Sequence, residues 1–157
     1  MQKVAVQLGE RSYPILISPQ LFNQSLTEFL PQARQVVIIS NPVVAGLYLP
    51  AVTALFPDSV VHSFILPDGE AYKTLSSFEQ VMSFLLEQKI NRDVLLVALG
   101  GGVIGDLTGF VAAEPPVIAS MGAGDVAGAL YTEQLGEIET SIAVARLAAS
   151  RVLSAAM

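Results

Sequence analysis

The sequence predicts an α/β fold, with a mostly parallel sheet, helices on both faces of the sheet and an N-terminal hairpin at one edge. Three observations support this prediction. Short strand-like runs alternate with helical segments between residues 36 and 113. Two of these runs, 36–39 and 94–99, are apolar throughout, which is typical of strands buried on both faces. Polar or glycine-rich segments follow the strands, at the place where parallel sheets bind ligands.

The first 30 residues predict a hairpin followed by a helix. Residues 4–8 alternate between apolar and polar side chains, residues 13–17 form a second strand, and Gly9 lies in the turn between them. Residues 21–30 carry leucine and phenylalanine at helical spacing, and the pattern stops before Pro31.

The first buried strand leads into a helix. Asn41 is suited to cap this helix, because Pro42 follows at the first helical position, where a proline is tolerated. The helix runs toward Phe56, and Pro50 predicts a kink or break inside it.

A second unit follows, with a strand over 60–66, a turn at 68–70 and a helix that begins at the capping box Ser-Ser-Phe-Glu of residues 76–79. Apolar residues 78, 81, 82, 85 and 86 fall on one face of that helix. After the strand at 94–99, three glycines lead into a helix that starts near Val103.

The character of the chain changes after Ala113, where Glu114 and two prolines end the helix. Residues 117–120 predict a strand, and the alanine-rich segments 126–135 and 139–155 predict two helices. We therefore expect one domain over residues 1–113, and a tail over residues 114–157 that packs on the same domain.

The composition excludes several classes of protein. Of 157 residues, 52% are hydrophobic and only 14% are charged, against roughly 25% in average globular chains, so disorder is excluded for most of the length. The net charge of −6 repels a phosphate backbone, so we expect no nucleic-acid partner. There is no cysteine for disulfides or thiolate metal sites.

Prolines and a glycine interrupt the charge-free run 35–57, so we expect no membrane span. We see no signal peptide and expect a cytoplasmic protein, with self-association through apolar surface that the chain leaves uncovered.

The first motif is the glycine loop of residues 97–106 (Val-Ala-Leu-Gly-Gly-Gly-Val-Ile-Gly-Asp). Three glycines allow a sharp turn and a close approach of a ligand to the backbone. The helix that follows directs free N–H groups at the loop, where a pyrophosphate would fit. The spacing is neither GxGxxG nor that of a Walker loop, and a tight turn without ligand is the alternative.

The second motif is Asp-Gly-Glu-Ala-Tyr-Lys at residues 68–73. Its carboxylates can accept the hydroxyl groups of a ribose, and its lysine can meet phosphate oxygens. The alternative is a solvated turn with a local Glu–Lys pair. Because both motifs and Asn41 follow strands of one parallel sheet, we expect them to meet at one edge.

Taken together, residues 67–73, Asn-Arg-Asp-Val at 91–94 and residues 98–110 closely resemble the 3-dehydroquinate synthases, and residues 8–15 are similar to bacterial members. The glycine loop is shared with related sugar-phosphate cyclases and with glycerol dehydrogenases, but the spacing of the second motif favours the synthases. The resemblance covers residue 1 to about residue 113. It implies a Rossmann-like domain that binds NAD. The residues that it assigns to the cofactor are Asp68, Gly69, Glu70, Lys73, Gly102, Val103, Ile104, Gly105, Asp106 and, on the adenosine side, Asn41.

The family reaction belongs to the shikimate pathway: NAD-assisted elimination of phosphate from 3-deoxy-D-arabino-heptulosonate 7-phosphate, and its cyclisation to 3-dehydroquinate. The resemblance also implies a metal, usually zinc, held by one glutamate and two histidines that the family carries beyond the equivalent of residue 113. Here His62 is the one histidine, expected half-buried in a strand, and no lysine follows Lys89 to bind substrate. We therefore expect a partial NAD site, with no catalytic residues and no metal site. A nucleotide-binding module without catalysis, and a structural chimera without ligand, are the alternatives.

Overall fold

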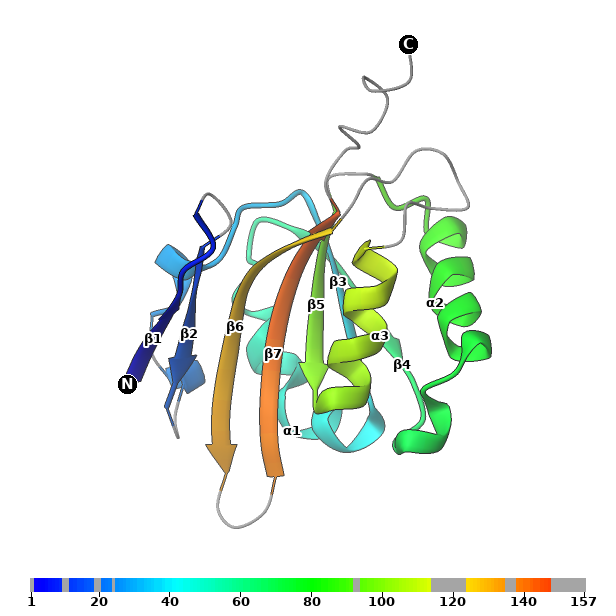
Figure 1. The fold of residues 1–157 in the computed structure, drawn as a ribbon. Helices are drawn as coiled ribbons and strands as arrows, with labels where there is room; N and C mark the ends of the chain where they lie inside the picture. Colours follow the sequence, from blue (N-terminus) through cyan, green and yellow to red (C-terminus); the bar gives the residue numbers. More distant parts are fainter. Residues whose placement is uncertain are drawn as a thin grey trace.

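The computed structural model describes residues 2–9, 12–18, 21–23, 25–91, 94–113, 124–134 and 138–147. Within these residues, seven strands form one sheet in the order β1-β2-β6-β7-β5-β3-β4 (Figure 1). The elements in chain order are β1 (Gln2–Val6), β2 (Tyr13–Ile17), 3₁₀ turns at Leu21–Asn23 and Thr27–Phe29, β3 (Gln35–Ser40), α1 (Pro42–Thr53), β4 (Val60–Ile65), a 3₁₀ turn at Glu70–Tyr72, α2 (Leu75–Glu87), β5 (Leu95–Gly100), α3 (Gly102–Ala113), β6 (Gly124–Gln134) and β7 (Ile138–Leu147).

The centre of the sheet is parallel and covered on both faces, as predicted. β3 pairs in parallel with β4 on one side and with β5 on the other. Alternate residues of β3 point to opposite faces: Val36 and Ile38 pack with α1, whereas Val37 and Ile39 pack with α2 and α3. Figure 1 shows α3 in front of the sheet and α1 behind it.

The rest of the sheet is mixed. The predicted edge hairpin is present, with β1 antiparallel to β2 and at the end of the strand order. β2 pairs in parallel with β6, whereas β7 is antiparallel to both β6 and β5. Parallel pairing is therefore confirmed for β4, β3 and β5, and antiparallel pairs separate these strands from the hairpin.

The two helices expected in the tail are wrong over its described residues, which form the strands β6 and β7. The alanine content favours a helix, but Ile138, Thr140, Ile142 and Val144 place β-branched residues at every second position. β7 also pairs along the whole of β5, whose backbone polar groups would otherwise lack partners on that side. The strand expected at 117–120 and the end of the second helix, 148–155, lie outside the described residues.

Three local expectations also change. Two 3₁₀ turns replace the helix over 21–30, because Leu21 and Leu26 are both fully buried and a helix would direct residues five apart to different sides. α2 begins at Leu75 rather than at the box of 76–79, because the Thr74 side chain accepts a hydrogen bond from Ser77 N. α1 continues through Pro50, whose exposed position lets water reach the carbonyl group that proline leaves without a donor.

Asn41 caps α1 as predicted: its side chain accepts a hydrogen bond from Val44 N. Among the described residues, no helix combines the length and the apolar character needed to cross a membrane.

Candidate functional site

The three segments singled out by sequence lie together at the carboxyl ends of the parallel strands. Asn41 comes directly after β3, residues 66–74 come after β4, and Gly101 joins β5 to α3. Side-chain contacts connect these segments across 27 and 33 residues of sequence. The predicted meeting of the motifs at one edge of the sheet is therefore what the structure has.

The first of these contacts joins the end of β3 to the loop after β4. The amide nitrogen of Asn41 donates to Asp68 Oδ1 at 3.0 Å. Asn41 is buried, whereas Asp68 is exposed. The hydrogen bond therefore holds one carboxylate oxygen of Asp68, while the carboxylate still faces solvent.

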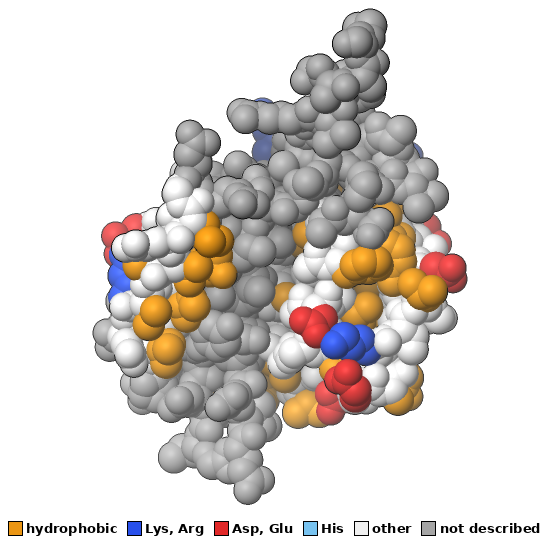
Figure 2. Space-filling view, in the orientation of Figure 1, with side chains coloured by type: hydrophobic (Ala, Val, Ile, Leu, Met, Phe, Trp, Pro, Cys, Tyr) orange, Lys and Arg blue, Asp and Glu red, His pale blue; other side chains and the backbone are white. Residues whose placement is uncertain are grey.

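The second contact joins the same loop to α3. Lys73 Nζ lies 2.6 Å from Asp106 Oδ2 and 3.7 Å from Glu70 Oε1. The hydrogen bond and the charge of Asp106, followed by the charge of Glu70, raise the pKa of Lys73. Both partners are well exposed, at 42% and 60% of their side-chain surface, so water screens the pair. Figure 2 shows a basic patch between acidic ones on this face.

The structure requires glycine at some positions of the site and leaves room for a side chain at others. Gly69 has φ +117°, a conformation that side-chain-bearing residues rarely adopt. A Cβ on Gly100 would lie 2.8 Å from Ile104 Cγ1, so packing excludes one there. Gly101 and Gly102 would meet nothing within 4 Å, and neither has positive φ. The chain turns from β5 into α3 through Gly101 alone, as expected of the triple glycine, and its second and third members leave open space beside the backbone.

The first turn of α3 has backbone amides without an acceptor inside the helix. Its first helical hydrogen bond runs from Gly105 N to Gly101 O at 3.0 Å, so the amides between them have no acceptor within the helix. Gly102 is exposed, as a ligand-facing residue should be, whereas Ile104 is 2% exposed and packs in the core. Of the predicted site residues, Ile104 therefore anchors α3, and Val103 packs partly against the same cluster.

Sequence reasoning missed an apolar groove beside the Lys73–Asp106 pair. The groove has a volume of about 370 Å³ and is lined by Lys73, Thr74, Leu75, Phe78, Asp106, Leu107 and Phe110. Phe78 of α2 and Phe110 of α3 meet edge to face, with ring centroids 5.0 Å apart. The two residues lie 32 positions apart on different helices, so helical spacing alone gives no signal that they meet.

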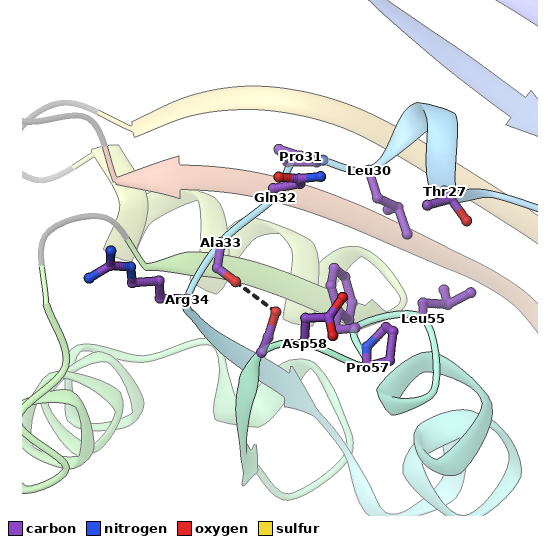
Figure 3. A pocket seen from close by; sticks show the side chains of 11 residues that line it. Thr27, Leu30, Pro31, Gln32, Ala33, Arg34, Leu55, Pro57 and Asp58 are labelled. Atoms are coloured by element: carbon purple, nitrogen blue, oxygen red, sulfur yellow. Dashed lines mark hydrogen bonds between the residues drawn. The ribbon is translucent and has the colours of Figure 1, made fainter.

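A second cavity lies at the opposite end of the strands and contains none of the predicted site residues. It has a volume of about 440 Å³ between the segments that precede β3 and β4, residues 27–34 and 55–59 (Figure 3). Ser59 Oγ donates to Ala33 O at 2.6 Å across it, so this hydroxyl links the two segments.

Within the described ranges, no three histidine, aspartate or glutamate side chains gather where they could hold a metal ion. His62 lies in β4 and is half-buried, as predicted. The described residues therefore do not fit the zinc site that the family resemblance implies.

Comparison with known proteins supports the family resemblance that rests on the sequence motifs. Residues 63–116 match the family described as 3-dehydroquinate synthase N-terminal. The 3-dehydroquinate synthase of Shewanella pealeana is 50% identical over 116 residues, covering 72% of this chain and 32% of the relative. That of Shewanella denitrificans is 52% identical over 114 residues, again covering 72% and 32%. The matches cover the N-terminal part, and the chain spans about a third of the length of these relatives.

Solved structures agree on the fold. A 2-deoxy-scyllo-inosose synthase complexed with carbaglucose-6-phosphate, NAD+ and Co2+ matches with a TM-score of 0.59 at 22% identity, over 71% of this chain and 31% of the other. A 2-epi-5-epi-valiolone synthase from Streptomyces hygroscopicus with NAD+ and Zn2+ bound matches with a TM-score of 0.52 at 24% identity, over 69% and 31%. The N-terminal part of this chain thus has the sequence motifs of 3-dehydroquinate synthases on the fold of related synthases.

Proposed function

We propose that this chain is the NAD-binding part of a cytoplasmic 3-dehydroquinate synthase, and that by itself it binds the dinucleotide weakly and performs no synthase reaction. The proposal rests on the sequence match of its N-terminal part, about 50% identical to 3-dehydroquinate synthases. It also rests on one structural observation. The contacts Asn41–Asp68 and Lys73–Asp106 assemble three distant segments into one site at the ligand-binding edge of the sheet.

The residues present fit NAD. Asp68 offers an exposed carboxylate for ribose hydroxyl groups, Lys73 offers an ammonium, and the start of α3 offers amides without a helical acceptor for the pyrophosphate. The open space at Gly101 and Gly102 admits the close approach that a pyrophosphate needs. When bound in the whole enzyme, NAD would supply a transient oxidation of a ring alcohol. The role of this chain is to hold and orient the dinucleotide.

No catalytic step is assigned to this chain. The described residues offer no metal cluster, and no lysine follows Lys89 to clamp a phosphorylated substrate. Elimination requires dinucleotide, metal and substrate to be positioned together, so a chain with one of the three sites holds a cofactor without turning it over.

A titration of the full chain with NAD, followed by ¹H–¹⁵N NMR, tests the proposal. We expect weak binding, because the relatives are three times as long and other parts of them can share the cofactor. Gly102→Val should weaken binding by blocking the open space, and Asp106→Ala by releasing Lys73. Gly46→Val is the matched control, since Gly46 is also an exposed helical glycine with nothing within 4 Å but lies in α1.

Three outcomes distinguish NAD binding at this site, NAD binding elsewhere on the chain and no NAD binding. Loss of binding in both site variants, with the control unaffected, supports the proposal. Binding that neither site variant changes would place NAD elsewhere and contradict it. No chemical-shift change at saturating NAD would favour the structural chimera. Complementation of a strain that lacks 3-dehydroquinate synthase then distinguishes an active enzyme from a nucleotide-binding module, and we expect no complementation.

A further inference from the structure

Asn41 lies at the junction of the site, and both ends of its side-chain amide are in use. The oxygen accepts from Val44 N at 2.9 Å, and the nitrogen donates to Asp68 Oδ1 at 3.0 Å. The residue is only 6% exposed. A group so buried and so paired has little left to offer a ligand directly, which argues against the direct adenosine contact that the sequence suggests.

Asp68, by contrast, is exposed and lies in the loop between β4 and the 3₁₀ turn at Glu70–Tyr72. The loop follows β4, where Leu66 N donates to Ser40 O at 2.8 Å, and it then passes through Gly69 with φ +117°. Between Leu66 and Gly69, the Asp68 carboxylate accepts the hydrogen bond from Asn41. It fixes one oxygen of the carboxylate and leaves the other to accept a hydrogen bond from a ligand.

The residue before Asn41 supports the other motif. Ser40 is fully buried, and its hydroxyl donates to Leu99 O at 2.6 Å, one residue before the three consecutive glycines of the glycine loop. Ser40, the last residue of β3, and Asn41, the residue after it, therefore connect to both halves of the proposed dinucleotide site. The position of Asp68 relative to the start of α3 depends on this dipeptide.

We propose that Asn41 is a positioning residue: it holds the Asp68 carboxylate in the orientation that accepts ribose hydroxyl groups, and it does not itself touch the dinucleotide. This inference rests on the proposed function, because it assumes that NAD binds at this edge. It differs from a capping role, since the cap uses only the amide oxygen.

A double-mutant cycle on the full chain separates these roles. Asn41→Ser keeps a hydroxyl that can cap α1 but is too short to reach Asp68. A hydrogen bond to a charged group contributes enough that its loss should weaken NAD binding about tenfold in an NMR titration. Asp68→Ala should weaken binding at least as much. In the Asp68→Ala background, Asn41→Ser should have no further effect, because its partner is already absent.

Two measurements without NAD guard against a purely structural effect. Hydrogen exchange at the Val44 amide should stay slow in Asn41→Ser and become faster in Asn41→Ala, which removes the cap as well. The side-chain amide signals of Asn41 should shift in Asp68→Ala, where the acceptor is gone. Together they report the cap and the Asp68 contact separately.

Equal effects of Asn41→Ser with and without Asp68 would mean that Asn41 contacts the ligand itself, and would overturn the inference. So would Asn41→Ser binding NAD like wild type while Asp68→Ala does not. If Asn41→Ser weakens NAD binding about tenfold in the wild-type background but not in the Asp68→Ala background, Asn41 acts by positioning Asp68. If Asp68→Ala and Gly102→Val both bind NAD as wild type does, the proposed function fails first and this inference with it.

Discussion

At the scale of single residues, the glycine loop divides into positions required by packing and positions left open. Gly100 has no room for a Cβ because Ile104 already fills that space, whereas Gly102 faces solvent with nothing near it. The sequence presents both as parts of one motif. Only the neighbouring atoms reveal that one serves the core and the other can serve a ligand.

Matched alanine substitutions should separate these two roles. Gly100→Ala forces a contact of 2.8 Å with Ile104 and should lower the free energy of unfolding by about 1–3 kcal/mol, the usual cost of overpacking. Gly102→Ala should leave unfolding unchanged or raise its free energy by up to about 1 kcal/mol, since alanine favours a helix over glycine. Urea denaturation measures both. Equal destabilisation by the two changes would contradict this division.

The Lys73–Asp106 pair should matter more for binding than for stability, because both side chains are well exposed. The hydrogen bond to Asp106, followed by the charges of Asp106 and Glu70, raises the pKa of Lys73 above the usual 10.5. A raised lysine pKa means that the contribution is complete below pH 10.5 and is lost as pH rises through the higher folded value. Lys73→Met should therefore change the free energy of unfolding by the same small amount at pH 6 and pH 9, as measured in urea. A difference that grows between these two pH values would contradict the assignment.

At the scale of elements, the sequence predicts best where local chemistry and burial agree. β2 has the predicted bounds, and Asn41 and Pro42 predict the start of α1, because capping depends on the cap and the next few residues. The start of α2 is less determined. Thr74 and Ser76 are both plausible caps, and in the structure Thr74 is the cap, because its side chain accepts a hydrogen bond from Ser77 N.

Two substitutions test which of these residues caps α2. Thr74→Ala should lower the free energy of unfolding by about 1 kcal/mol, because it leaves Ser77 N without its acceptor. Ser76→Ala should cost less, since Ser76 lies inside the first turn and its contact with Gln80 is long, at 3.5 Å. Thermal or urea unfolding of the two variants decides. A larger cost for Ser76→Ala would restore the capping box as the start of the helix.

The strands β6 and β7 mark the limit of local reasoning. Alanine-rich composition and β-branched alternation make opposing predictions for 138–147, and the free side of β5 decides in favour of a strand. A strand partner is a property of the sheet rather than of the segment. Likewise, the groove between Phe78 and Phe110 depends on how α2 and α3 pack, whereas the meeting of the glycine loop with residues 68–73 follows from parallel strand order alone.

At the scale of the whole molecule, α1 presents an outer face without charge. Val43 and Leu47 are about half exposed, and no charged residue occurs from residue 35 to residue 57. Two copies of a chain with net charge −6 repel each other least where such a face meets its own copy. We therefore expect self-association at high concentration through α1.

Sedimentation velocity of charged variants tests this surface. Leu47→Glu should shift the chain toward monomer. The matched control is Leu86→Glu, because Leu86 is exposed to a similar degree, 53% against 49%, but lies on α2. Equal loss of self-association in both variants would indicate non-specific attraction rather than an interface at α1.

The chain as a whole should show no synthase turnover with NAD and zinc supplied. Elimination of phosphate needs a dinucleotide, a metal and a substrate clamp held in register, since orientation provides much of the rate. The described residues assemble the candidate dinucleotide site and no metal cluster, and the chain has one histidine and no lysine beyond Lys89. Phosphate release by the purified protein measures this directly, with Asp106→Ala as the control for contaminating host enzyme. Turnover that this variant abolishes would show that the chain carries catalytic groups beyond those assigned.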